Sequence, residues 1–396
     1  MESSSEHSCY AGASATELLE RIVREGATDT AINILDLDAI VHNVRRWTEA
    51  APDLVPFYLP SANNHPAVLA LLGKLGVGFS CASIGEMRSV LRFGVPPERI
   101  ILAHPAKSPE TILYARQEGI RRIVCDSVQE IGKVHRLYPT AQIVLRVRVC
   151  VEQKFGCCPD NDLPEILRYV QSLEPFHIAG VHFAMPQERL QPGQTLRQVL
   201  FTAERTMAQV TASGQCDVRE FILSGTGKLP SSQLQKVLSE FSLKSNVQVI
   251  VETERQFVQS AVTLVTSIQS KRVVRETEPS GPIREIMYFI NDGRYGSFEW
   301  WWNALDMPPP VVHRSVGTVS PTPTHPSSLW GPSCDSADMV CERLYLPDLE
   351  IGDFLVFPDM GAYGVTLASC FNGFPIPRTV VCACSEATKA LLQDMS

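Results

Sequence analysis

The sequence has no excess of basic charge, no apolar run long enough to cross a bilayer and no hydrophobic segment at its start. It contains 35 Lys and Arg against 43 Asp and Glu, for a formal net charge of −8. Nucleic acids and anionic membrane surfaces are bound through basic faces, so we expect neither as a partner. The first residues, Met1 to His7, lack the basic and apolar regions of a signal peptide. These absences predict a soluble, cytoplasmic protein.

Patterns for metal binding and for dinucleotide binding are also missing. The 12 cysteines are scattered, and neither Cys157-Cys158 nor Cys382-Ala383-Cys384 has a matching Cys or His pair at zinc-ligand spacing. Without a secretory signal we expect reduced thiols, and we expect no metal site. No glycine fingerprint of a dinucleotide-binding fold follows the first expected strand. The 396 residues are enough for two domains.

What is present, over residues 31–260, is an alternation of short β-branched runs with longer helical stretches. Nine runs are expected as strands: residues 31–35, 55–59, 78–81, 99–103, 122–125, 142–149, 177–183, 220–223 and 247–252. Strands that alternate with helices at this spacing predict a parallel sheet. Eight or nine such units favour a closed (β/α)8 TIM-like barrel, whose active site lies at the carboxyl ends of the strands.

The pattern changes after residue 260. Four strands are expected among proline-rich loops: residues 261–274, 285–290, 350–357 and 378–384. Because no second run of strand–helix units appears, residues 261–396 are predicted to form a mostly antiparallel β domain. Residues 1–30 carry one amphipathic helix, from Thr16 to Glu25, and are expected to pack on that β domain.

Seven short segments resemble, in order and in spacing, the ornithine decarboxylase family of fold-type III pyridoxal phosphate (PLP) decarboxylases, which also holds the antizyme inhibitors. They are FSCAS at 79–83, LR at 145–146, KFG at 154–156, GVHF at 180–183, NDGRYGSF at 291–298, WGPSCD at 330–335 and MGAY at 360–363. Each segment is a weak signal alone, whereas the ordered set is specific. The resemblance implies a PLP-binding barrel followed by a β domain, in agreement with the pattern of strands and helices.

By that resemblance, seven positions match cofactor and substrate residues of the family. They are Glu252 for the pyridine nitrogen; Arg255, Tyr363, Gly225 and Gly227 for the phosphate; and Cys334 with Asp335 for protonation and for the distal amine of the substrate. A carboxylate at the ring nitrogen stabilises the pyridinium that makes PLP an electron sink, and a guanidinium fork suits a phosphate. Taken alone, Glu252 and Arg255 could equally be a structural pair, and Cys334 a buried thiol.

The position of the Schiff-base lysine differs from the family. Residues 56–63 read PFYLPSAN where the family has PFYAVKCN, which places Ser61 at the lysine. A serine hydroxyl cannot form an imine with an aldehyde. The resemblance therefore implies PLP as the family cofactor, and Ser61 implies that this chain does not bind it as an internal aldimine.

Further departures from the family pattern surround that position. They are Ser80 for an aspartate, Ala184 for a histidine that stacks on the cofactor ring, Thr226 in the glycine loop, Glu254 for a glycine beside the phosphate and Ala304 for a second substrate acid. The β-branched Thr226 obstructs the approach of a phosphate to backbone N–H groups, and Glu254 repels it. His182 is expected on the same strand face as Ala184. The tryptophans at 300–302 are expected to pack or to form a contact surface.

Two functions are compatible with these residues. The first is a catalytically inactive, antizyme-inhibitor-like regulator in polyamine (putrescine) metabolism that binds no PLP. The second is a working PLP-dependent decarboxylase of ornithine or a related amino acid, which the retained Glu252 and Cys334 support. The sequence favours the first, because no other lysine is evident at an active-site strand end: Lys74 is in a helix and Lys228 is in the altered glycine loop.

The resemblance also implies protein partners. Antizyme binds this family through a region that matches residues 105–136, where five basic residues are expected to form a surface for an acidic partner: Lys107, Arg116, Arg121, Arg122 and Lys133. A lysine–aspartate bridge across the family dimer matches Lys154 and Asp338, so we expect a weak homodimer. The chain ends at Ser396, soon after the last strand, so we expect no long degradation tail.

Overall fold

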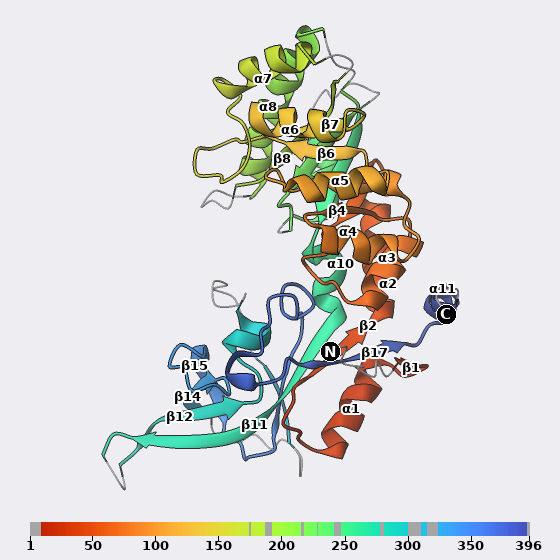
Figure 1. The fold of residues 1–396 in the computed structure, drawn as a ribbon. Helices are drawn as coiled ribbons and strands as arrows, with labels where there is room; N and C mark the ends of the chain where they lie inside the picture. The colour runs from red at the N-terminus through yellow and green to blue at the C-terminus, as the bar shows by residue number, and fades with distance from the viewer. Residues whose placement is uncertain are drawn as a thin grey trace. The chain divides into compact units, whose positions relative to one another are not determined.

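The computed structural model describes residues 9–173, 176–186, 192–214, 218–227, 229–240, 247–277, 281–299, 310–314 and 324–393. The chain divides into two compact units (Figure 1). The barrel unit comprises residues 43–256, and the β unit comprises residues 1–42 and 257–394. None of the described helices is long and apolar enough to span a membrane.

The described strands of the barrel unit are parallel and close into a ring in the order β10-β3-β4-β5-β6-β7-β8-β9. Their bounds are Leu54–Tyr58 (β3), Gly78–Cys81 (β4), Ile100–Leu102 (β5), Arg122–Cys125 (β6), Gln142–Val147 (β7), Ile178–Ala184 (β8), Glu220–Ser224 (β9) and Gln248–Thr253 (β10). The helices are Leu37–Ala50 (α2), Pro66–Lys74 (α3), Ile84–Leu91 (α4), Pro109–Gln117 (α5), Val128–Leu137 (α6), Asp162–Gln171 (α7), Pro192–Ala212 (α8), Ser231–Ser239 (α9) and Arg255–Val258 (α10). The predicted (β/α)8 barrel is confirmed.

Apolar side chains fill the interior of the ring. One buried cluster takes a single residue from each of six strands: Phe57, Ile101, Val124, Val144, Ile222 and Ile250. Where β4 passes the Phe57 ring the chain has Gly78, and a β-carbon there would lie 2.5 Å from that ring. The missing side chain of Gly78 therefore makes room for Phe57 inside the barrel.

The β unit contains one sheet with the strand order β1-β17-β2-β11-β12-β14-β15, and β16 pairs with β11 and β13. The bounds are Cys9–Ala11 (β1), Ile32–Asp36 (β2), Val262–Arg275 (β11), Ile283–Ile290 (β12), Val311–His313 (β13), Thr324–Trp330 (β14), Met339–Pro347 (β15), Phe354–Phe357 (β16) and Arg378–Ala383 (β17). Pairing is antiparallel except for β1 with β17, β17 with β2, and β12 with β14. The predicted, mostly antiparallel β domain is confirmed.

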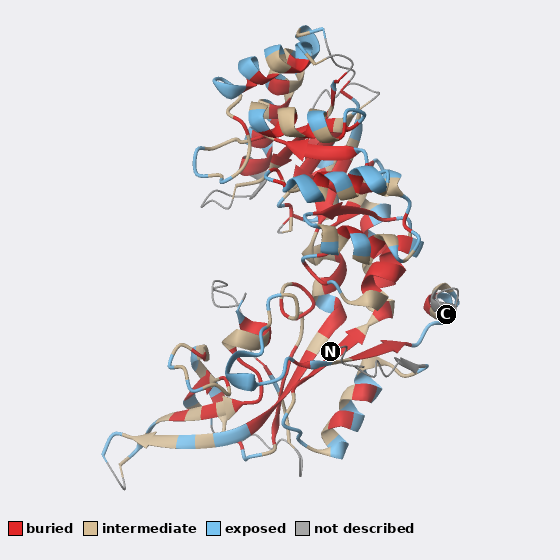
Figure 2. Cartoon of the chain, viewed as in Figure 1, coloured by how far each residue is buried: buried red, intermediate tan, exposed pale blue. Residues whose placement is uncertain are grey.

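Helix α1, Ala15–Glu25, lies against this sheet. Its residues Leu18 and Ile22 join a buried cluster with Ile34, Val265 and Val356 of the strands. Figure 2 shows the buried positions concentrated along the strands and on one side of α1. Helix α11, Glu386–Gln393, follows β17.

One strand belongs to a different sheet from the one expected. The sequence pattern predicts the first barrel strand at residues 31–35, but β2 pairs with β11 and β17 in the β unit. The prediction that the barrel begins at residue 31 is therefore wrong, and the barrel unit begins at Asn43. A buried β-branched run has the same local appearance in either sheet. Its partners lie more than 200 residues further along the chain, at 262–265 and 378–382.

Candidate functional site

Polar residues occupy the layer directly above the apolar interior of the barrel, at the carboxyl ends of the strands. Each of them lies two positions further along its strand than a residue of the apolar layer, or than Gly78 or Gly180. These polar residues are Ser80, Asp126, Arg146, His182, Ser224 and Glu252. Alternate residues of a strand share a face, so these side chains are directed to the inside of the ring. The carboxyl end is where active sites of such barrels lie.

His182 of β8 and Glu252 of β10 form the best-defined pair of this layer. Nε2 of His182 lies 3.4 Å from Oε2 of Glu252, and their side chains are 0% and 4% exposed. Both ring nitrogens of His182 and Oε1 of the carboxylate have no hydrogen-bond partner among the described residues, so the 3.4 Å approach is a close polar contact rather than a hydrogen bond. Arg146 on β7 lies beside His182 in the strand register. The layer thus holds a fully buried acid, an imidazole and a guanidinium.

Burial opposes charge on both members of the pair. It would raise the pKa of Glu252, but the His182 ring and the hydroxyls of Ser80 and Ser224 outweigh burial and lower that pKa to about 2. Burial lowers the pKa of His182, and Arg146 adds to this effect while Glu252 opposes it. The attraction to Glu252 is strongest for a charged ring, whereas complete burial favours a neutral one. Because burial dominates, we assign a neutral imidazole beside a carboxylate at neutral pH.

Ser61 lies in the turn that follows β3 and is exposed. The turn begins at Leu59, whose N–H donates to the carbonyl of Thr253 at 3.2 Å, and Ala62 N–H donates to the carbonyl of Leu59 at 3.0 Å. Thr253 ends β10, one residue after Glu252. Ser61 therefore stands at the carboxyl end of β3, and its turn is attached to the strand that carries Glu252.

Gln256 links the loop after β9 to the turn after β10. Its Nε2 donates to Thr226 Oγ1 at 3.3 Å, and its Oε1 accepts the N–H of Glu254 at 2.9 Å. Thr226 is 1% exposed, and the preceding Gly225 has a positive φ of 75°. Reasoning from the sequence missed Gln256. A side chain able to donate and accept, next to the expected phosphate residues, is the signal that could have found it.

Gly227 and Arg255 also meet at this point. A β-carbon on Gly227 would lie 3.6 Å from Cδ of Arg255, so the arginine stem passes over the glycine. The expected phosphate positions Gly225, Gly227 and Arg255 are thus brought together in the barrel unit. Ala184 is half-buried at the end of β8, two residues after His182. Lys228, the tryptophans at 300–302 and Ala304 lie outside the described residues.

In the β unit, Cys334 and Asp335 lie in the loop between β14 and β15. The Cys334 thiol is exposed. The Asp335 carboxylate accepts hydrogen bonds from the Ala337 N–H, at 3.0 Å, and from the Tyr295 hydroxyl, and these bonds lower its pKa. The Tyr295 ring stacks on Phe371 with 4.3 Å between the centroids. Asp335 is therefore held in one orientation, beside an exposed thiol.

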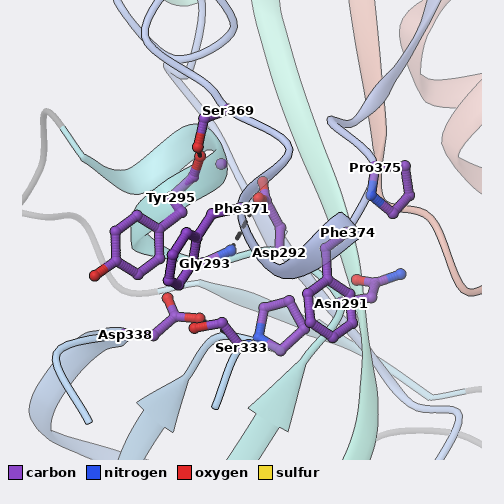
Figure 3. Close-up of a pocket in the computed structure, with 12 residues that line it drawn as sticks. Asn291, Asp292, Gly293, Tyr295, Ser333, Asp338, Ser369, Phe371, Phe374 and Pro375 are labelled. Carbon is purple, nitrogen blue, oxygen red and sulfur yellow. Dashed lines mark hydrogen bonds between the residues drawn. The ribbon is translucent and has the colours of Figure 1, made fainter. Parts of the chain in front are cut away.

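A pocket lies next to this loop, between the segments at 291–296, 332–338 and 369–375 (Figure 3). Asp292 accepts the N–H of Gly293 at 2.9 Å and that of Ser297 at 3.2 Å. Burial raises the pKa of Asp292 to about 6, although these bonds oppose the shift. Tyr363 follows in a separate loop, where its φ of 63° is positive.

Asp338, the expected partner of Lys154 in a bridge between subunits, lines the same pocket. It is 2% exposed, and its two oxygens accept the N–H groups of Arg294 at 2.7 Å and Ser333 at 2.9 Å. This carboxylate therefore holds two loops of its own unit together. Lys154, by contrast, is exposed in the barrel unit, with Nζ 4.8 Å from the centroid of the Phe155 ring.

Lys107 is buried and does not contribute to the basic surface expected over residues 105–136. Its side chain is 0% exposed and lies 3.0 Å from the carboxylate of Glu130. Nζ donates to three carbonyls, those of His104 at 3.1 Å, Pro105 at 3.2 Å and Val124 at 2.6 Å. All the protons of the ammonium are thus used inside the barrel unit.

Two more of the five basic residues are paired internally. Arg122 is only 10% exposed and pairs with Glu220 at 2.9 Å, and Lys133 pairs with Glu130 at 2.7 Å. Arg116 and Arg121 are exposed and donate to nearby carbonyls, those of Leu137 and Thr140. The expectation of a five-residue basic surface is therefore wrong. Internal ion pairing of the other three is not visible in a count of charges.

The chain resembles known proteins over most of its length. Residues 37–215 match the family described as pyridoxal-dependent decarboxylase, pyridoxal binding domain. The chain is 32% identical over 387 residues to antizyme inhibitor 2 of Xenopus laevis, covering 91% of this chain and 83% of that protein. It is 32% identical over 399 residues to ornithine decarboxylase of Mus musculus, covering 93% and 84%. The chain belongs to the ornithine decarboxylase family.

The structure agrees with membership of the ornithine decarboxylase family. The lysine/ornithine decarboxylase of Vibrio vulnificus, complexed with putrescine, superposes with a TM-score of 0.79 at 27% identity, covering 93% of this chain and 98% of that one. The resemblance read from the seven segments is confirmed. Relatives at the same identity include decarboxylases and an antizyme inhibitor, so membership alone does not decide between catalysis and regulation.

Proposed function

We propose that this chain is a non-catalytic member of the ornithine decarboxylase family that acts in polyamine metabolism by binding a partner. The observation that carries the proposal is Ser61, an exposed serine at the carboxyl end of β3, where the family resemblance places the Schiff-base lysine. Family decarboxylases form an imine between a lysine amine and the cofactor aldehyde. A serine hydroxyl has no nitrogen with which to form it.

Two lysines lie in loops after strands among the described residues of the barrel unit, and neither replaces the missing amine. Lys107, after β5, donates to three carbonyls and lies 3.0 Å from the Glu130 carboxylate, so its nitrogen is held by groups of the barrel unit itself. A nucleophilic amine needs a free lone pair, which those bonds deny it. Lys154, after β7, is exposed, and its Nζ lies over the Phe155 ring rather than in a buried environment that would activate it.

The residues around Ser61 do not fit PLP. The cofactor requires an acid at its ring nitrogen, donors for its phosphate and an amine for its aldehyde. The acid, Glu252, already has His182 at 3.4 Å. The N–H of Glu254 is already bonded to Gln256, and the Glu254 carboxylate adds negative charge where a phosphate would come. These three mismatches act on separate parts of the cofactor and support a protein that does without it.

The partner we propose is antizyme. A relative that is as similar to this chain as the mouse ornithine decarboxylase is, at 32% identity, is named antizyme inhibitor 2. Within residues 105–136 the surface available to it is smaller than the sequence suggested. Of the five expected cations, Arg116 and Arg121 remain exposed, and near them in the sequence is Leu113, whose side chain on α5 is 46% exposed. Two cations beside an apolar residue suit an acidic partner that also makes an apolar contact.

The absence of an internal aldimine is tested by incubating the purified chain with PLP, reducing with borohydride and measuring intact and peptide masses. We expect no stoichiometric pyridoxyl adduct. A single adduct on Lys107, Lys154 or another lysine of the barrel unit would refute the non-catalytic proposal. A family decarboxylase carried through the same steps serves as the positive control.

Partner binding is tested with the double variant R116E/R121E in a titration against antizyme. We expect at least a tenfold loss of affinity, about 1.4 kcal/mol. The matched control is R168E, because Arg168 is an exposed arginine on α7 that also bonds to a nearby carbonyl. Unchanged binding by R116E/R121E, or no binding by the unaltered chain, would reject antizyme recognition through this surface.

A second function, PLP-dependent decarboxylation with an altered anchor, has one observation in its favour. Asp335 is held by the Ala337 N–H and the Tyr295 hydroxyl, next to the exposed Cys334 thiol, so the expected substrate pair is kept in order. Release of carbon dioxide from ornithine, abolished by the variant C334A, would establish this alternative. We favour the regulator because the substrate pair alone cannot stabilise the carbanion left by decarboxylation.

A further inference from the structure

We propose that Gln256 and His182 are internal stand-ins that close the former cofactor site: Gln256 fills the place of the phosphate and His182 takes the acid meant for the ring nitrogen. The proposal deepens the proposed function, because it explains how the barrel is kept ordered without a cofactor. It rests on two contacts of the chain with itself, one at each end of the expected site.

At the phosphate end, Gln256 makes the bonds that an anion would otherwise attract. Its Oε1 accepts the N–H of Glu254 at 2.9 Å, as a phosphate oxygen would. Its Nε2 donates to Thr226 Oγ1 at 3.3 Å, which draws the middle residue of the Gly225–Gly227 loop towards the turn after β10. A neutral amide satisfies these groups without bringing charge next to the Glu254 carboxylate.

At the end of the site expected to hold the pyridine ring, His182 lies next to Glu252, the acid of β10 that would contact the ring nitrogen. Both side chains are buried, and Nε2 is 3.4 Å from Oε2 of Glu252. An unpaired buried carboxylate is costly, so it requires a nearby donor or positive charge. The imidazole ring lies against the carboxylate and Arg146 supplies positive charge. An imidazole in this position also leaves less room for a pyridine ring.

The two stand-ins make different predictions about ligands, which allows each to be tested by itself. Gln256 should exclude only compounds that carry a phosphate. His182 should exclude the ring, with or without a phosphate. The probes are therefore PLP, pyridoxal and inorganic phosphate, and the measurement is equilibrium dialysis, which needs no catalysis. An ordinary turn contact at Gln256 would not discriminate between PLP and pyridoxal.

The first experiment removes the Glu254 carboxylate from every variant, so that the effect of Gln256 on ligand binding is measured without that charge. E254G keeps the N–H that Gln256 accepts and loses the carboxylate. We expect E254G/Q256A to bind PLP at least tenfold more tightly than E254G, with no gain for pyridoxal and with competition by inorganic phosphate. The control is E254G/Q233A, since Gln233 is an exposed glutamine on α9. Equal PLP affinity of E254G and E254G/Q256A would overturn the role of Gln256.

The second arm uses H182S, with H177S as the control because His177 is exposed just before β8. We expect H182S to gain affinity for pyridoxal and PLP alike, by about the same factor. If H182S does not fold, as a urea unfolding curve would show, H182N replaces it. No gain in a folded variant would overturn the role of His182.

Binding of PLP by the unaltered chain tests the proposal as a whole. The result of this measurement is independent of the test of the proposed function. Saturable PLP binding at micromolar concentration by the unaltered chain would refute closure, while the Ser61 argument against an imine would remain. Conversely, failure to bind antizyme would refute the proposed function and leave closure standing. Both measurements are made on the same full-length preparation.

Discussion

The carboxylate of Glu252 and the imidazole of His182 meet inside a closed ring of strands, with 3.4 Å between Oε2 and Nε2. Their strands, β10 and β8, are separated in the ring by β9, so the contact crosses the interior of the barrel rather than a strand pair. The layer of side chains below this pair is apolar and includes Val144, Ile222 and Ile250. A polar pair enclosed in this way needs its own members as partners, because the apolar layer offers no hydrogen bonds.

This pair predicts that the stability of the barrel falls with acid. Burial lowers the pKa of folded His182 below 6.5, so the unfolded chain takes up a proton first and stability is lost as pH falls below about 6.5. The pKa of Glu252 is lowered from 4.5 to about 2, so a second loss follows between those values. Urea unfolding at pH 8.0 and about 5.5 should show the first loss, and H182Q should reduce it.

Two comparisons isolate that effect. Asp292 of the β unit acts in the opposite sense, because its pKa is raised from 3.8 to about 6. Its contribution to the free energy of unfolding therefore decreases as pH rises between these two values. The difference between the unaltered chain and H182Q removes this contribution. H177Q, at an exposed histidine, serves as the control for loss of a histidine. The same change in stability between the two pH values for the unaltered chain and for H182Q would contradict a neutral, buried His182.

Restoring the lysine alone should not restore catalysis. S61K places an amine at the carboxyl end of β3, but Gln256 still holds the Glu254 N–H and His182 still lies at the acid. We expect decarboxylation of ornithine to remain more than about a hundredfold below a family decarboxylase, which is about 2.7 kcal/mol of barrier. Carbon dioxide release measures it. Turnover closer than that would show that the remaining differences matter little.

Lys107 should act on stability and not on partner binding. K107M leaves three carbonyls and the Glu130 carboxylate buried without the ammonium, which should destabilise the chain by about 3–5 kcal/mol. K236M is the matched control, because Lys236 is exposed on α9, and it should change stability by less than about 0.5 kcal/mol. Urea unfolding measures both variants. A stable K107M with weakened antizyme binding would return Lys107 to the surface role first expected.

Much of the barrel and its site could be predicted from the sequence. Periodicity is a local property, and the runs that became β3 to β10 alternate with helices at a spacing that only a parallel sheet accommodates. Strand alternation likewise predicts that His182 and Ala184 share one face of their strand. Ser61 at the end of β3 and Glu252 at the end of β10 follow from the same register.

What could not be predicted depends on contacts between distant residues. Strand β2 joins a sheet whose other members lie beyond residue 261, and nothing local distinguishes it from a barrel strand. Lys107 is buried because the carbonyl of Val124 and the carboxylate of Glu130 converge on it. Gln256 and Asp338 have polar side chains typical of a surface, and only the folded loops show which backbone N–H groups they accept.

Assembly should depend on apolar contact rather than on the expected bridge. Asp338 is 2% exposed and already accepts two N–H groups, so a partner's lysine has little to bind. K154A should therefore change the dimer dissociation constant by less than about fivefold, that is by less than about 1 kcal/mol. The β unit instead exposes Phe371, Phe374 and Ile376 by 42%, 39% and 40% in one loop. Neighbouring exposed apolar side chains of this kind are typical of an interface.

We expect a weak homodimer in exchange with monomer, and sedimentation velocity over a concentration series measures it. A cofactor bound at an interface would stabilise the dimer by mass action, and a chain that binds none lacks this contribution. F371D should shift the equilibrium towards monomer at least tenfold, because a carboxylate buried at an interface is costly. Y345D is the control, since Tyr345 is 72% exposed on β15, outside that loop. A dimer that persists at nanomolar concentration would reject weak pairing, and equal effects of F371D and Y345D would reject the loop as its contact.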